Sequence, residues 1–273
     1  MTSQPPFPQP VFPQAPLPQA PAPLAPARPG TGLRAPTRQD AGIGVTLAIT
    51  LICAWTCTLI CALVWPPPLL LVPLVVLLRT FLCTGLFITA HDAMHGLVDP
   101  GRPRVNRALG ALAVFLYAGF AWRPLLQAHH QHHARPGTPE DPDFHRGDPR
   151  PLPWFLSFMR RYVNLAQLVR VALVFQLLVF VMGGGLVEVL LYHSVPALLS
   201  AVQLWWFGTF RPHRPRLDGF PDAHHARSEG WPGWATFLSC FHFGLHHTHH
   251  LAPWVPWWRL PGARDAVAGQ RQG

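Results

Sequence analysis

The sequence contains no lysine, and only 12% of its 273 residues are charged, whereas 49% are hydrophobic. In an ordinary soluble domain about a quarter of the residues are charged. The apolar residues also occur in long blocks, which is typical of membrane-spanning helices. The 21 basic residues are all arginine and give a net charge of +9, but no basic helix or RNA-binding motif accompanies that charge. The composition therefore indicates an integral membrane protein and argues against a nucleic-acid partner.

Cysteine is also scarce, and its spacing excludes a disulfide framework and a sulfur-bound zinc site. Cys53, Cys57 and Cys61 follow one another at intervals of four residues in an apolar stretch, and Cys83 and Cys240 are isolated. Cysteines spaced in this way are small hydrophobic side chains on one face of a helix. Because the sequence has no CxxC pair, any metal must be bound by ligands other than sulfur.

The composition divides the chain into three regions. Residues 1–38 are dominated by Pro, Gln and Ala, which favours a disordered, polyproline-like tail. This tail lacks the charged start and the continuous apolar stretch of a signal peptide. We expect residues 39–265 to form the membrane domain and residues 266–273 to form a disordered C-terminal tail.

The apolar blocks predict an all-α integral membrane fold with four transmembrane helices in two hairpins. Spans at about residues 43–65 and 69–90 flank the sequence PPP, and spans at about residues 165–182 and 186–210 flank GGG. A shorter apolar piece, residues 108–122, fits an interfacial or re-entrant helix better than a full crossing.

The arginines set the expected orientation. The two turns contain none, whereas arginines precede the first span, fill the segment between the second and third spans, and follow the last span. By the positive-inside rule, both termini and the central segment are cytoplasmic. The histidine-rich segments fall on the same side, so we expect a cytoplasmic, histidine-rich cap on a protein of the bacterial inner membrane.

One arginine, Arg79, falls in the middle of the second predicted span, where a charge is costly in lipid. Glu188 and the polar groups of neighbouring helices are both available as partners. The sequence does not decide between them, and we expect a structural contact inside the membrane.

Histidine is concentrated in three clusters beside the predicted spans. HDAMH follows the second span, and HHQHH and HHTHH occur further along the chain. On a helix, residues i, i+3 and i+4 lie on one face. His130 and His247 are rotated by about 100° from those faces. The other eight are the predicted metal ligands: His91, His95, His129, His132, His133, His246, His249 and His250.

The ligand type limits the metal. Imidazole suits zinc, copper, iron or nickel, and four ligands are enough for one structural zinc, so eight imply two ions. HExxH is absent, and a pair of irons that activates O2 at the membrane surface fits best. Asp92, Asp141 and Asp143 lie near the clusters and could orient the imidazoles, but turn or helix-cap roles explain them equally well. A membrane metal transporter, the alternative from another class, would need ligands inside the spans.

The order HxxxH, HxxHH, HxxHH around two hairpins resembles the integral-membrane fatty-acid desaturase and hydroxylase superfamily. Longer stretches resemble its bacterial β-carotene ketolases, the 4,4′-oxygenases: GLFITAHDAMHG, GTPEDPDF, FGTFRPHRP, FPDAHHARS and FHFGLHHTHHLAPWVPWWRLP. The resemblance covers about residues 45–265. It implies a di-iron monooxygenase that oxidises carbon 4 of the β-ionone ring to an alcohol and again to a gem-diol, which loses water to give a ketone.

The resemblance also implies substrates, partners and one more ligand. β-Carotene would become echinenone and then canthaxanthin, with O2 as co-substrate and electrons from a separate, ferredoxin-type donor, since the chain has no flavin, nicotinamide or Fe–S motif. A carotenoid ring hydroxylase and a fatty-acyl desaturase use the same histidines and stay open as alternatives. The superfamily adds a histidine between the last span and the third cluster, for which His224 is preferred over His225 and His213. His242, on the same helical face as His246, is a further ligand or orienting residue.

The segment after the third cluster is rich in Trp and Pro. Trp254, Trp257 and Trp258 make a rigid amphipathic segment suited to the membrane interface. A C40 polyene must pass from the bilayer to the metal, and an aromatic passage at this segment is one explanation. An interfacial belt without contact to the substrate is the other.

Overall fold

A computed structural model describes most of the chain: residues 33–145, 148–180, 183, 185–215, 217 and 219–270. Every regular element in these ranges is a helix, which confirms the predicted all-helical class. Residues 1–32 of the expected N-terminal tail lie outside the described residues. The boundary expected at residue 265 falls inside the last helix, α12 (Leu260–Gln270), and the end of the C-terminal tail again lies outside the described residues.

Three helices are long and apolar enough to cross a membrane. α1 (Arg38–Val64) begins with a capping box between Thr37 and Asp40 and ends before three prolines, which cannot continue a helix. A short turn, η1 (Leu69–Leu71), leads into α2 (Val72–Met94). The third long helix consists of five consecutive segments: α7 (Leu186–Val189), η2 (Leu190–Ser194), α8 (Val195–Trp205), η3 (Trp206–Phe210) and α9 (Arg211–His213). Two of them, η2 and η3, are π-helical, a form common at functional sites.

Two further pairs of helices are sharply bent. α3 (Pro103–Ala118) ends at Gly119, whose φ of 67° is left-handed, and α4 (Trp122–Ala134) leaves at 99° to it. α5 (Pro151–Tyr162) and α6 (Leu165–Phe180) meet at 84°. By length and composition, three helices could cross a membrane, or up to five if each bent pair counts as one span. The expected count of four lies between these limits. The short apolar piece predicted near residue 108 belongs to α3 and ends at the bend.

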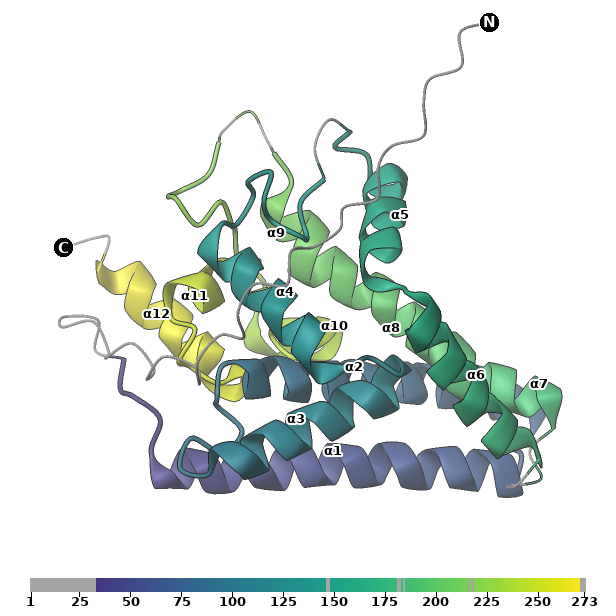
Figure 1. The fold of residues 1–273 in the computed structure, drawn as a ribbon. Coiled ribbons are helices and arrows are strands. Elements are labelled where there is room, and N and C mark those ends of the chain that lie inside the picture. Colours follow the sequence, from purple (N-terminus) through teal and green to yellow (C-terminus); the bar gives the residue numbers. More distant parts are fainter. Residues whose placement is uncertain are drawn as a thin grey trace, which may run out of the picture.

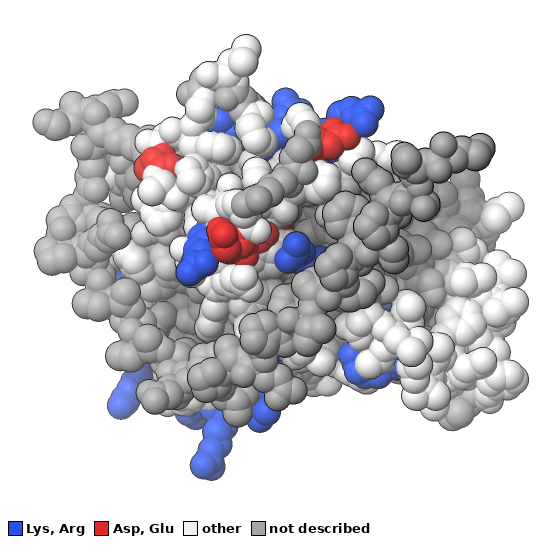
Figure 2. Space-filling model, turned by 45° about the horizontal axis from the view of Figure 1, so that its top comes forward, with Lys and Arg blue, Asp and Glu red and all other residues white. Residues whose placement is uncertain are grey.

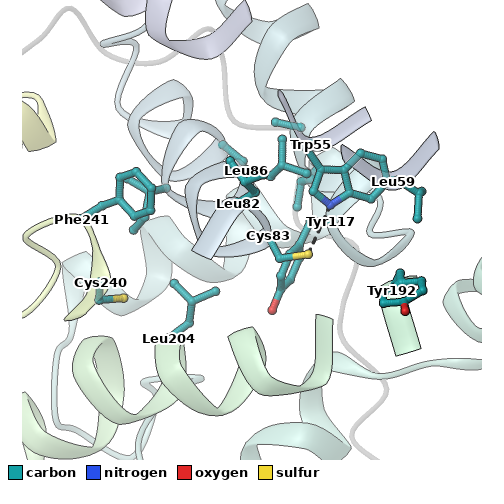
Figure 3. Packing of buried hydrophobic residues seen from close by; sticks show 14 of the residues in the cluster. Trp55, Leu59, Leu82, Cys83, Leu86, Tyr117, Tyr192, Leu204, Cys240 and Phe241 are labelled. Carbon is teal, nitrogen blue, oxygen red and sulfur yellow. Dashed lines mark hydrogen bonds between the residues drawn. The ribbon is translucent and has the colours of Figure 1, made fainter. Parts of the chain in front are cut away.

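Helix α2 lies at the centre and packs against α1, α3 and α8. Figure 3 shows this core, where the indole N–H of Trp55 donates to the sulfur of Cys83 at 3.2 Å beside Tyr117. The outer surface carries many exposed leucines, including Leu69, Leu70, Leu173 and Leu198. An apolar surface of this extent is expected where a protein faces lipid. The protein is therefore an integral membrane protein, as predicted.

Arg79 is fully buried in this core. Its Nε donates to the carbonyl of Tyr192 at 2.7 Å, and one terminal nitrogen donates to the carbonyl of Trp55 and the hydroxyl of Thr58. The guanidinium also lies over the Trp55 ring, 4.8 Å from its centroid. Of the two kinds of partner considered from the sequence, the structure therefore shows polar groups of neighbouring helices, and these contacts join α1, α2 and the third long helix.

The C-terminal elements form a cap at one end of the helices. α10 (Gly233–Cys240), α11 (His246–Leu251) and α12 lie toward the end where α1 begins, together with α4 and α9 (Figure 1). The short η4 (Trp257–Arg259) directly precedes α12. α7 lies at the opposite end. On the face shown in Figure 2, the described atoms at that opposite end are white, and the blue and red side chains lie closer to the cap.

Candidate metal centre

The structure brings nine histidines together in two groups, and the possible ligand atoms of each group lie within 4.8 Å of one another. The first group consists of His91, His95, His129, His133 and His249, and the second consists of His132, His213, His246 and His250. All eight histidines predicted from the clusters are among these nine. The predicted off-face histidines are outside both groups, because His130 contacts the Met94 carbonyl and His247 contacts Asp222.

Helical register explains how three sequence clusters make two groups. The last turn of α2 directs His91 and His95 into the first group. On α4, His129 and His133 are one turn apart and join the first group, whereas His132 is rotated toward the second. The same division occurs on α11, where His249 faces the first group, and His246 and His250, which are one turn apart, face the second. Each HxxHH motif therefore serves both groups.

The ring nitrogens within each group point toward one another. In the first group, the Nε2 atoms of His95 and His129 are 2.7 Å apart, and those of His133 and His249 are 3.0 Å apart. In the second group, the Nε2 of His250 lies 3.1 Å from that of His132. Nitrogens that converge on one point, rather than on separate hydrogen-bond partners, are the arrangement that a metal ion requires.

The hydrogen bonds of the Nδ1 atoms show which ring nitrogen of a histidine is free to bind metal. The Nδ1 of His132 lies 2.9 Å from the Asp141 carboxylate, and the Nδ1 of His213 lies 2.8 Å from the carbonyl of His225. Because carboxylate and carbonyl oxygens accept hydrogen bonds, each Nδ1 carries the proton and each Nε2 carries a lone pair. The Nε2 atoms of His213 and His91 are buried and have no partner in the described structure. The donor set thus fits two ions bound by imidazole.

The three aspartates predicted to orient imidazoles differ in their contacts. Asp141 binds His132 directly and also accepts from the amides of Gly137 and Asp143. Burial raises the pKa of Asp141, but the hydrogen bonds that it accepts, chiefly from His132, outweigh burial, and the net pKa is lowered. Asp92 lies 3.6 Å from the Nδ1 of His91 and accepts from the amide of Trp257 at 3.1 Å.

Asp143 lies behind the same imidazole as Asp141 but has a different partner. Its Oδ2 is 3.9 Å from the Nδ1 of His132, and its Oδ1 accepts from the hydroxyl of Tyr162. Burial is the main reason why the pKa of Asp143 is raised. Tyr162 was not singled out from the sequence, because nothing in the sequence links α5 to this loop.

The ninth histidine of these two groups is His213, and the preferred candidate, His224, lies outside both. The backbone N–H of His224 donates to Asp222 at 2.9 Å, and the ring centroid of His224 lies 6.0 Å from that of His250, outside the second group. His225 directs its Nδ1 to the carbonyl of Pro136. His213 ends the third long helix, and its ring nitrogen lies with those of His132, His246 and His250.

His242 also lies outside both groups. Its Nδ1 is 2.8 Å from the hydroxyl of Thr236, and its backbone N–H donates to the carbonyl of Thr236. Its φ of 63° lies in the left-handed region, so the helical face that it was expected to share with His246 does not exist. The sequence placed both residues on one helix, but α11 begins only at His246.

The histidines of α11 are held in the form that binds metal. Burial, together with the neighbouring imidazoles, lowers the pKa of His246, His249 and His250 well below the usual histidine value. They are therefore neutral near pH 7, and neutral imidazole is the form in which histidine coordinates a metal ion.

A long apolar cavity of about 360 Å³ reaches this centre from within the helices. His91, His129, His132 and His246 form part of its wall, and Trp55 and His193 line it elsewhere. Trp55 stacks on Arg79, which is about three helical turns, or roughly 18 Å, from His91 along α2. Leu168 of α6 and Leu198 of α8 line the cavity and are also exposed on the outer surface, so the cavity reaches the lipid-facing side.

The tryptophans predicted as a passage lie elsewhere. None of Trp254, Trp257 and Trp258 lines this cavity. Trp254 is only 5% exposed and packs with Leu245 and its neighbours, whereas Trp257 stacks on Phe237 and bonds to Asp92 through its amide. Of the three, Trp257 contacts Asp92, which lies beside His91, and the walls of the cavity include residues of α3, α6 and α8.

An all-helical membrane protein with two histidine groups at the end of an apolar cavity is the class that the fold and site define. The model of the fatty acid desaturase family matches residues 64–173 and 158–272. A β-carotene ketolase of Paracoccus sp. (strain PC1) is 48% identical over 186 residues, 68% of this chain and 76% of the relative. A β-carotene ketolase of Haematococcus lacustris is 35% identical over 84% of this chain and 81% of its own.

A third relative is the zeaxanthin 4-ketolase of Chlamydomonas reinhardtii, which is 37% identical over 253 residues, 87% of this chain and 56% of the relative. The chain therefore belongs to the fatty acid desaturase family and, within it, to the β-carotene ketolases.

Proposed function

We propose that this protein is a carotenoid ketolase that oxidises carbon 4, and carbon 4′, of β-ionone rings. β-Carotene would be converted to echinenone and then to canthaxanthin. The observation that carries the proposal is the apolar cavity that begins at the lipid-facing surface and ends at the two histidine groups. A long hydrocarbon with a cyclic end is the kind of substrate that such a cavity can take up from a bilayer.

Two irons are the proposed metals, held by the five histidines of the first group and the four of the second. Bound there, iron would supply the reduction of O2 and the insertion of one oxygen atom into a carbon–hydrogen bond. Each oxidation consumes one O2, two electrons and two protons, and releases one water. The second oxidation at carbon 4 gives a gem-diol, which loses water to leave the ketone. The electrons would come from a separate, ferredoxin-type donor.

The side chains around the centre have separate tasks in this proposal. Asp141 holds the proton on the Nδ1 of His132 and thereby fixes the ring, while the carbonyl of His225 does the same for His213. The apolar wall excludes water, which protects the reaction from side products. The ring of the substrate would lie near Met94 and Phe243, which line the cavity together with His91 and His246.

We further propose four spans in two hairpins, with both termini and the metal centre on the cytoplasmic side of a bacterial inner membrane. The absence of arginine from the turns at 66–68 and 183–185 supports this orientation. A soluble electron donor could then reach the centre directly.

Expression in a bacterium that makes β-carotene, followed by pigment chromatography, tests the function. Echinenone and canthaxanthin should accumulate and should disappear when O2 is withheld. Accumulation of zeaxanthin alone, oxidised at carbon 3, would make the protein a ring hydroxylase. New unsaturation in membrane fatty acids with unchanged β-carotene would make it a fatty-acyl desaturase.

A further inference from the structure

The end of the cavity next to the second histidine group carries a hydrogen-bonded polar pair. Tyr162, from the last turn of α5, and Asp143, from the loop after α4, both line the cavity. The hydroxyl of Tyr162 donates to Asp143, and Asp143 lies 3.9 Å from the imidazole of His132. A polar pair is conspicuous here because the neighbouring wall is formed by apolar side chains such as Phe158 and Met159.

We propose that Tyr162 and Asp143 form a subsite that binds the hydroxyl group of a 3-hydroxylated β-ionone ring. The inference rests on the proposed function, which brings carbon 4 of the ring to the histidine groups. Carbon 3 is bonded to carbon 4, so a hydroxyl on carbon 3 necessarily reaches the same end of the cavity. Asp143 lies beside His132 of the second group, Tyr162 donates to Asp143, and all three line the cavity, which places the pair in the region that this hydroxyl would reach.

The geometry of the pair suits both kinds of ring. The hydroxyl of Tyr162 donates its hydrogen bond to Asp143, and the hydroxyl oxygen of Tyr162 keeps lone pairs that can accept another. The hydroxyl of the substrate would donate to that oxygen, in a chain that the carboxylate polarises. An unsubstituted ring brings no polar group, and the pair then stays satisfied internally. The subsite therefore favours hydroxylated rings without rejecting β-carotene.

Two other polar side chains in the wall are alternative partners for the hydroxyl. Gln167 donates through its Nε2 to the carbonyl of Ala118, at the end of α3, but its buried Oε1 has no partner in the described structure. Thr209, in the π-helical segment η3, also lines the cavity. Tyr117→Phe is a matched control, since it removes the same atom from another part of the same cavity.

The test compares zeaxanthin, which carries the 3-hydroxyl, with β-carotene. Metal-free protein in lipid nanodiscs would be titrated with each pigment, and quenching of tryptophan fluorescence would report binding. Tyr162→Phe should weaken zeaxanthin binding about tenfold relative to β-carotene binding, which is the effect of losing one polarised hydrogen bond. In iron-loaded protein, the ratio of kcat/KM for the two pigments should shift by about the same factor. Tyr117→Phe should leave both ratios as in the wild type.

A substrate-side measurement needs no variant. The dimethyl ether of zeaxanthin cannot donate a hydrogen bond, so the wild type should bind it about tenfold more weakly than zeaxanthin. Equal binding of zeaxanthin and its dimethyl ether would overturn the subsite. So would a ratio of zeaxanthin to β-carotene affinity that Thr209→Val changes and Tyr162→Phe does not. If the wild type oxidises neither pigment at carbon 4, the proposed function fails instead, which keeps the two failures distinct.

Discussion

Replacement of His213 by alanine is the sharpest test of the proposed ligand set. The side chain of His213 is 1% exposed, and its Nε2 is buried without a partner beside His246 and His250. The substitution leaves three imidazoles in the second group and all five in the first. Loss of a group that only supports a ligand lowers metal affinity about 10- to 100-fold, so loss of the ligand itself should exceed about 100-fold, or roughly 2.8 kcal/mol.

Elemental analysis of the purified protein measures the outcome. His213→Ala should reduce the iron content from about two ions per chain to about one and should abolish ketone formation. His224→Ala is the control, since its ring lies outside the second group, and it should keep about two ions. Circular dichroism of both variants would check that the helices are intact. Iron loss in His224→Ala with full iron in His213→Ala would refute the assignment.

Three further predictions concern the surroundings of the centre. Asp141→Ala should lower the affinity for one iron about 10- to 100-fold in a chelator competition, and an unchanged affinity would mean that His132 does not need its partner. Ala201→Phe should block the cavity, so that ketone formation falls while the iron content stays at the wild-type level; parallel loss of both would point to misfolding instead. The metal-free protein should lose stability as the pH falls through about 6.5. Burial lowers the pKa of side chains such as His246 in the folded protein, so below this pH the unfolded chain binds more protons than the folded chain. Thermal unfolding midpoints that are equal at about pH 5.5 and about pH 7.5 would contradict this.

The helical part of the fold could be predicted because it depends on local properties of the sequence. Long apolar blocks and the prolines after α1 fix where the long helices lie. The bends at Gly119 and between α5 and α6 could not be predicted in the same way. They depend on how these helices pack on their neighbours, and apolar length alone cannot distinguish a bent pair from a straight span.

The candidate site was predictable to a similar degree. The i, i+3, i+4 spacing identified eight of the nine grouped histidines, but it could not show that His132 and His133 face different groups. His213 and His224 both follow the apolar part of the last span, and only the continuation of the helix to His213 separates them. The cavity was not foreseen, because its walls come from helices far apart in the sequence.

The central claim is that two irons, held by these nine imidazoles, use O2 to oxidise carbon 4 of a carotenoid ring. The most direct measurement supplies iron-loaded protein in nanodiscs with β-carotene, a ferredoxin-type reductant and oxygen-18-labelled O2, and analyses the 4-hydroxylated intermediate by mass spectrometry. The account predicts that this hydroxyl carries the label from O2 and that zinc-loaded protein gives no product. An unlabelled hydroxyl, or equal turnover with zinc, would contradict it.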